Sequence, residues 1–156
     1  MAAWLRRLAE MGLDLPDVAR PVAAYVPARV HGDLIHVSGQ LPAVRGEIRQ
    51  RGRLGDDVTV EQGQDAARLA TLNALAAAAS VAPGGPDAIG GVLRVEGYVQ
   101  CSPDFHEQSQ VVNGASHLLG ALFPEAGHVR LAVGCAALPL NAAVEVAVTF
   151  ILAPRT

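Results

Sequence analysis

The stretch Arg130–Glu145, RLAVGCAALPLNAAVE, constrains the fold of this chain more than any other segment. Because successive side chains of a strand point to opposite faces, its alternation predicts two strands joined across residues 138–141. The pattern predicts a bulky face made of Leu131, Val133 and Cys135 in the first strand and Val144, Val146, Val148 and Phe150 in the second. The opposite face is mostly alanine and glycine, and it carries two charged side chains, Arg130 and Glu145.

A bulky β-branched face is typical of a sheet that packs against helices. A face that met only water would carry more polar side chains, so the small face indicates a second surface packed closely against it. We therefore predict that Arg130 and Glu145 lie together on the face of the sheet without helices, where the subunits of an oligomer meet.

The segments that precede this stretch follow a simple order. The pattern predicts a short helix at residues 2–11, an irregular lead-in to residue 21, and a hairpin of residues 22–29 and 34–41. The charged, glycine-rich loop at residues 42–57 is expected to be solvated. Ser38, which falls in the hairpin, is predicted to share the small face of the sheet.

Two long helices are predicted further along the chain. Thr59 and Gln62 have the spacing of a capping box, which predicts a helix that runs to about residue 81. Residues 92–101 alternate as a strand, and Ser102 is expected to cap a second helix. The apolar stripe of that helix consists of Val111, Ala115, Leu118 and Leu122. The order ββαβαββ predicts an α+β fold, in which two helices cover one face of a mixed sheet of four to six strands.

Composition excludes several classes of protein. The chain has 156 residues, of which 51% are hydrophobic and 17% charged, so we expect one domain over residues 1–156 with its core at 22–152. A net charge of −3 offers no general attraction to nucleic acid or to anionic membranes. No apolar run reaches the ~20 residues of a membrane span, and the N-terminus lacks a signal-peptide pattern, so we expect a cytoplasmic location. Cys101 and Cys135 are expected to be buried, reduced thiols.

Four pieces of the sequence, taken in order, resemble the YjgF/RidA family, the reactive intermediate deaminases also named L-PSP endoribonucleases. They are Tyr25, the motif SGQLP at residues 38–42, Asn113, and the stretch Arg130–Glu145 with its internal Leu138-Pro139. Their spacings look like the family's pattern. The resemblance covers about residues 20–152 and implies a chorismate-mutase-like fold. Proteins of that fold are homotrimers, whose sheets form an inner barrel with ligand clefts between the subunits.

The resemblance also implies roles for individual residues. In the family, the residue matching Arg130 binds the carboxylate of a 2-imino or 2-enamino acid, and the residue matching Glu145 helps to position the attacking water. Residues that line or shape the cleft match Tyr25, Ser38, Gly39 and Asn113. Typical members carry a cysteine two residues after the arginine, where this chain has Ala132. This departure, the N-terminal helix and the loop at 42–59 mark a divergent branch.

No metal or organic cofactor is expected. His31 and His36 flank a turn, and His106 and His117 are about three helical turns apart, so neither pair is placed to share a metal ion. His128 lies two residues before Arg130 and is a further candidate for contact with a ligand. The alternative for Arg130 and Glu145 is an ion pair at a subunit interface.

The leading hypothesis is hydrolysis of 2-imino and 2-enamino acids to 2-keto acids and ammonia in an intersubunit cleft. A guanidinium matches a carboxylate bidentately, and a glutamate can accept a proton from water. The alternative is a non-enzymatic protein that binds a small carboxylate in the same cleft. Ribonuclease activity ranks third, because an acidic chain without lysine offers little to RNA. The expected partners are a carboxylate-bearing metabolite and further copies of the chain, with no nucleic acid or membrane.

Overall fold

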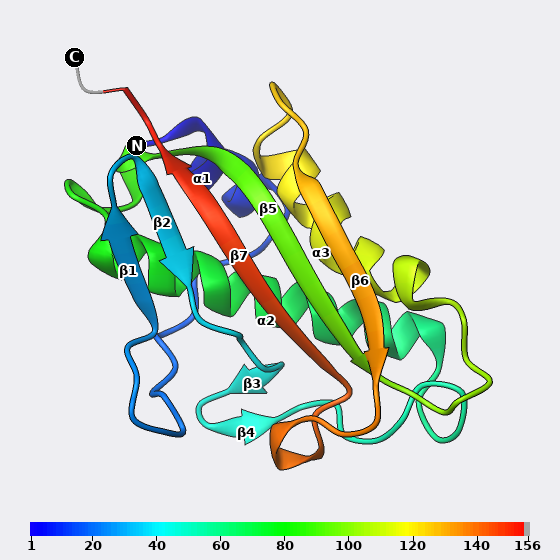
Figure 1. The fold of residues 1–156 in the computed structure, drawn as a ribbon. Helices are drawn as coiled ribbons and strands as arrows, with labels where there is room; N and C mark the ends of the chain where they lie inside the picture. Colours follow the sequence, from blue (N-terminus) through cyan, green and yellow to red (C-terminus); the bar gives the residue numbers. More distant parts are fainter. Residues whose placement is uncertain (155–156) are drawn as a thin grey trace.

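The computed structural model describes residues 1–154 as two layers, a mixed sheet and the helices that cover one of its faces (Figure 1). Residues 155 and 156, the end of the predicted domain, lie outside this description. The sheet has five strands in the order β1-β2-β7-β5-β6. They are β1 (Ala28–His31), β2 (Leu34–Val37), β5 (Ile89–Gln100), β6 (Val129–Cys135) and β7 (Val144–Leu152). β6 runs parallel to β5, whereas all other neighbours are antiparallel. The predicted α+β architecture is confirmed.

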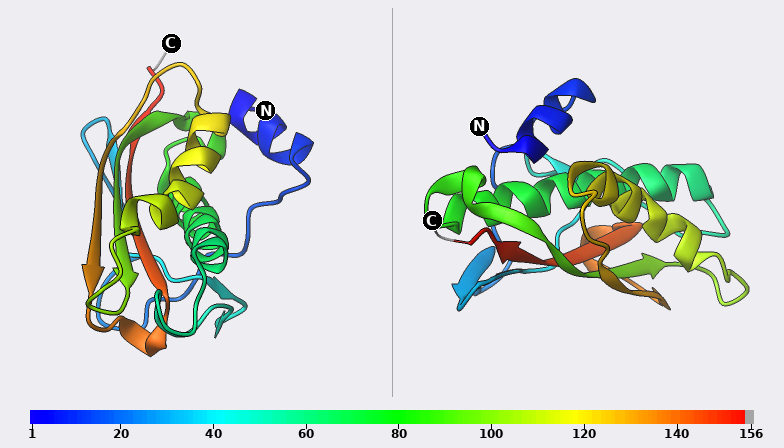
Figure 2. Two further views of the ribbon diagram at one scale, coloured as in Figure 1. Left: turned by 90° about the vertical axis from the view of Figure 1, so that its right-hand side faces the viewer. Right: turned by 90° about the horizontal axis from the view of Figure 1, so that it is seen from above.

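Both long helices lie on the same face of the sheet, and Figure 2 shows the other face bare. They are α2 (Val60–Val81) and α3 (Gln108–Leu122). The capping box of Thr59 and Gln62 is present, so the predicted start of α2 is confirmed. Its alanine-rich sequence presents small side chains, which let the helix lie close to the sheet. The short elements are β3 (Ala43–Val44), β4 (Glu47–Ile48) and the 3-10 helices Gly85–Ala88 and Pro139–Asn141.

The N-terminal helix α1 (Ala3–Glu10) packs onto the helical layer, on its side away from the sheet (Figure 2). Trp4 is buried, its ring lies 5.7 Å from that of Phe123, and its Nε1 donates to the carbonyl of Pro86 (3.1 Å). Arg7 donates to the carbonyl of Leu122 (2.8 Å), one of the last carbonyls of α3, which no N–H of that helix can reach. These contacts anchor α1, and the lead-in then returns along the helices to reach β1.

The structure reverses the predicted orientation of β6. Arg130 pairs with Val95 of β5, which faces the helices, so Arg130, Ala132 and Gly134 point toward α3. Leu131, Val133 and Cys135 point to the bare face instead. The reason is the close approach of α3 to the sheet. A Cβ on Gly97 would lie 2.7 Å from Cγ1 of Val112, so only small residues fit beneath the helix.

Two predicted boundaries are also wrong. Residues 22–27 are irregular, because the first strand of the hairpin begins only at Ala28. The second long helix begins at Gln108 and not at Ser102, whose backbone N–H donates to Leu54 (2.9 Å) and so holds the segment in a turn. β6 and β7 are not neighbours, because β5 lies between them.

Gly97 provides a test of this close packing. We expect Gly97→Ala to lower the free energy of unfolding by about 1–3 kcal/mol, because the added methyl group overpacks the contact with Val112. The matched control is Gly91→Ala on the same strand, where the nearest atom to the new Cβ lies at 4.0 Å. Urea unfolding followed by circular dichroism measures both changes. Equal midpoints for the two variants would contradict the packing described here.

Candidate ligand-binding and catalytic site

Arg130 lies on the edge strand β6 and reaches toward α3. Its Nη1 donates to Oδ1 of Asn113 (2.7 Å) and to Oγ of Ser116 (3.2 Å), and its Nη2 donates to the carbonyl of Ser109 (3.2 Å). Three acceptors from one helix therefore fix the guanidinium. A guanidinium has five N–H donors, so two remain without an acceptor among residues 1–154. Those two donors are the number that a carboxylate accepts in a bidentate contact.

A histidine extends this network. Nε2 of His128 lies 2.8 Å from Oγ of Ser116. Arg130 donates to the same serine oxygen, so Ser116 links the guanidinium to the imidazole ring. Burial, and secondarily the charge of Arg130, lower the pKa of His128, which keeps the ring neutral near pH 7.

Glu145 lies on the opposite, bare face of the sheet. It pairs across the strands with Tyr98 and packs against the backbone of Gly39. A Cβ on Gly39 would lie 2.9 Å from Cδ of Glu145, so residue 39 has no room for a side chain. Burial raises the pKa of the Glu145 carboxyl above its ordinary value. The neighbouring Ser38 donates its hydroxyl hydrogen to the carbonyl of Val26 (2.7 Å).

Arg130 and Glu145 of one chain do not share a face, so the prediction that they lie together is wrong. Arg130 is in register with Val95, whereas Glu145 is in register with Tyr98 three residues further along β5. With β5 between their strands, their Cα atoms are about 14 Å apart along the sheet, and the side chains point in opposite directions. Within one chain the two charges form no ion pair.

The remaining predicted residues divide between these two places. Asn113 belongs with Arg130, while Ser38 and Gly39 belong with Glu145. Tyr25 is 45% exposed in the irregular segment before β1, and it lines a cavity together with Gly39. Cys135 is half-buried rather than buried, whereas Cys101 is buried as predicted, and both are free thiols.

Sequence reasoning missed Ser109 and Ser116. Together with Asn113 they stand at positions i, i+4 and i+7, which is the spacing of one helix face. That spacing is the signal that could have found them. Their face of α3 meets β6, so the three residues present their acceptors to the arginine.

Two other predictions concern absences. Residues 1–154 contain no group of three histidine, cysteine, aspartate or glutamate side chains placed to hold a metal ion. In the same part of the chain, every helix is too short or too polar to cross a membrane.

Glu145 allows a prediction about pH. The pKa of Glu145 is raised in the folded state, so this carboxyl loses its proton more readily in the unfolded chain. At neutral pH, ionisation of Glu145 therefore lowers the free energy of unfolding. We expect Glu145→Gln to be more stable than the wild type near pH 7. The difference should vanish as the pH falls below the ordinary glutamate pKa of about 4.3. Urea unfolding at several pH values measures this, with Glu10→Gln on the exposed side of α1 as the control. Lower stability of Glu145→Gln at pH 7 would contradict the assignment.

The fold and these residues define a class: small α+β proteins that present an arginine at one edge of the sheet and a carboxylate on its bare face. The chain belongs to the YjgF/chorismate mutase-like family, described as "putative endoribonuclease", which it matches over residues 5–152. It is 43% identical to Protein TCP17 of Trypanosoma cruzi over 148 residues, which are 94% of this chain and 90% of that protein.

Solved structures agree with this assignment. The crystal structure of Atu1372 from Agrobacterium tumefaciens, a protein of unknown function, has a TM-score of 0.88 and 39% identity, covering 97% of this chain and 93% of that one. RidA from the Antarctic bacterium Psychrobacter sp. has a TM-score of 0.61 and 21% identity, covering 86% and 94%. The second likeness shows a shared fold, and the predicted chorismate-mutase-like architecture is confirmed.

Proposed function

We propose that this protein hydrolyses 2-imino and 2-enamino acids to 2-keto acids and ammonia, in a cleft formed between two protomers of a homotrimer. The observation that carries the proposal is the fixed guanidinium of Arg130, which keeps two donors for a carboxylate. Because Glu145 of the same chain points away, the second half of the site would be Glu145 of a neighbouring protomer.

The bare face of the sheet supports the assembly. It carries apolar side chains at positions that a water-facing sheet would give to polar residues, including Leu93, Val129 and Val133, which are 41%, 58% and 36% exposed. A second copy that covered this face would bury them. It would also bring its own edge strand, with Arg130, toward the neighbour's Glu145.

The chemistry requires a held substrate, a placed water and a proton for the departing ammonia. Arg130 would bind the substrate carboxylate in a bidentate contact, which places the imine carbon. Glu145 would accept a proton as water adds to that carbon, and would return it to the nitrogen as the carbinolamine collapses to ketone and ammonia. Burial raises the pKa of this carboxyl in the single chain, which makes the carboxylate a stronger base than an exposed glutamate. Tyr25, Ser38 and Gly39 would shape the cleft beside Glu145, with Asn113 behind Arg130.

The direct test uses an imine generated in the assay. An L-amino-acid oxidase converts its substrate to the 2-imino acid, and purified protein is expected to speed the release of ammonia. An equal rate with and without the protein would reject the deaminase proposal.

A second candidate is a cytoplasmic protein that binds a small carboxylate without turning it over. The observation that favours it is that Arg130 offers its two donors without any help from Glu145. A thermal shift with 2-ketobutyrate, in a protein that releases no ammonia, would select this function. Endoribonuclease activity, which the family description names, has little support, because the net charge of −3 repels RNA.

A further inference from the structure

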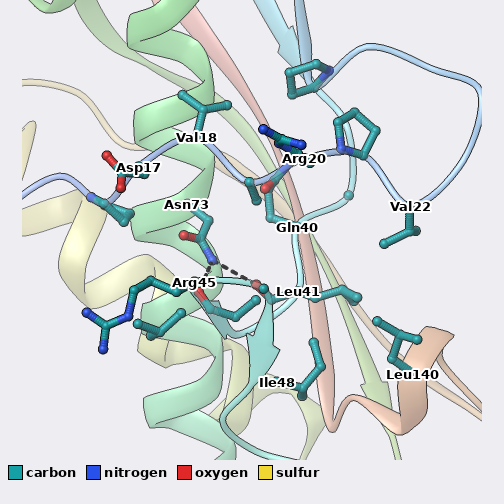
Figure 3. Close-up of a pocket in the computed structure, with 18 of the residues that line it drawn as sticks. Asp17, Val18, Arg20, Val22, Gln40, Leu41, Arg45, Ile48, Asn73 and Leu140 are labelled. Atoms are coloured by element: carbon teal, nitrogen blue, oxygen red, sulfur yellow. Dashed lines mark hydrogen bonds between the residues drawn. The ribbon is translucent and has the colours of Figure 1, made fainter.

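A cavity of about 530 Å³ opens between the lead-in, the β3–β4 hairpin and α2 (Figure 3). This volume lies within the range of sites for small organic molecules. Most of its lining is apolar and comes from segments far apart in the sequence, including Val18, Val22, Leu41, Ile48 and Leu140. Arg130 and Glu145 are not part of this lining, whereas Tyr25 and Gly39 are, so the cavity adjoins the cleft proposed beside Glu145.

Two buried polar side chains, Gln40 and Asn73, are part of this lining. Asn73 of α2 is only 2% exposed, and its Nδ2 donates to the carbonyls of Leu41 and Ala43, both at 3.0 Å (Figure 3). Because both partners are acceptors, the orientation of the amide is fixed. Its Oδ1 accepts no hydrogen bond from residues 1–154. An occupant without an N–H or O–H group would leave room for a water that donates to this oxygen.

Basic side chains outnumber acidic ones in the lining of the cavity. Arg20 of the lead-in and Arg45 of the hairpin line it, together with Asp17. Neither arginine takes part in an ion pair within residues 1–154. Two guanidinium groups and one carboxylate leave a net charge of +1, which suits a ligand with a single negative charge. The fork of a guanidinium matches a carboxylate.

Two lining residues have strained backbones. Arg45, with φ 51°, and Leu140, with φ 57°, are in the left-handed region, which side chains of these types rarely adopt. Arg45 and Gly46 form the two-residue turn of the β3–β4 hairpin, where asparagine is the preferred first residue. Such strain concentrates at ligand sites. Here it places an arginine and a leucine on the walls of one cavity.

We propose that this cavity is a second binding site, for an amphipathic carboxylate with an apolar body of about eight carbons and one charged end. The apolar body would lie against the walls near Leu41, Ile48 and Leu140. The carboxylate would bind Arg45, whose side chain is exposed at the cavity. The site gives the lead-in and the 42–57 loop a function. It shares Tyr25 and Gly39 with the cleft proposed beside Glu145, but its ligand binding is measured without the deaminase reaction.

Isothermal titration calorimetry with hexanoate, octanoate and 1-octanol tests the site in the wild-type protein. Octanoate is expected to bind about fifteenfold more tightly than hexanoate, because two further methylene groups are buried. 1-Octanol is expected to bind roughly tenfold more weakly than octanoate, since it lacks the charge for Arg45. No heat with octanoate, or equal affinity for the two acids, would overturn the proposal.

Variants separate this site from the one at Arg130. Arg45→Asn suits the turn, so its fold is retained, and we expect roughly tenfold weaker octanoate binding. Leu140→Asn also suits its left-handed backbone and should reduce the difference between octanoate and hexanoate. Arg49→Asn, an exposed arginine outside the cavity lining, is the matched control and should bind as the wild type does. Octanoate binding that survives Arg45→Asn but is lost in Arg130→Ala would place the ligand elsewhere and overturn the proposal.

Discussion

Replacing Arg130 by alanine is expected to lower kcat/KM for imine hydrolysis at least a hundredfold, which corresponds to about 2.7 kcal/mol of transition-state stabilisation. The side chain would supply two charge-assisted hydrogen bonds to the substrate carboxylate. Without them the imine carbon is no longer held near the water. The measurement is steady-state ammonia release over a range of oxidase-generated imine concentrations.

Two further variants make this result specific. Arg130→Lys keeps the charge but not the planar fork, so we expect an intermediate loss, carried mostly by KM. Arg6→Ala removes an exposed arginine of α1 and should leave kcat/KM unchanged. Since Asn113 and Ser116 lose a donor in Arg130→Ala, its unfolding temperature must be compared with that of the wild type. A folded Arg130→Ala protein with wild-type kcat/KM would exclude this residue from the site.

Mixing two inactive variants is expected to restore activity. Arg130→Ala and Glu145→Gln would each inactivate every site of a homotrimer. If each site takes its arginine from one protomer and its glutamate from the next, random assembly of equal amounts makes about one quarter of the sites intact. The mixture, unfolded and refolded together, should therefore reach about a quarter of wild-type activity.

The controls for this experiment are internal. Each variant refolded alone should stay inactive, and a mixture prepared without unfolding should gain activity only as fast as subunits exchange. A site contained within one chain predicts no recovery at any mixing ratio. Recovery of about a quarter of wild-type activity would therefore support both the role of the two residues and their division between protomers.

The sequence predicted correctly those features that depend on residues close together in the chain. The capping box at Thr59 and Gln62 acts within one helical turn, and the stripe from Val111 to Leu122 is buried as predicted. The alternation of β7 also held, because its large residues at Val144, Val146, Val148 and Phe150 all fill the core. In each case one face of an element differs strongly from the other.

The failures involve packing between distant segments. In β6 the large residues do not face the core, because Gly97 and Gly134 leave room for α3 to approach and a small face is what fits there. The alternation of large and small residues within β6 does not show which of its two faces α3 covers. The insertion of β5 between β6 and β7 is equally non-local. The reversed orientation of β6 puts Arg130 and Glu145 on opposite faces, and the inserted strand separates them further.

That division has a consequence for regulation. If turnover needs groups from two chains, dilution below the dissociation constant of the assembly would stop catalysis while every chain kept its own core. Specific activity would then rise with protein concentration until the complex saturates. A molecule that occupied the uncovered side of the sheet would then block the proposed activity without resembling the imine.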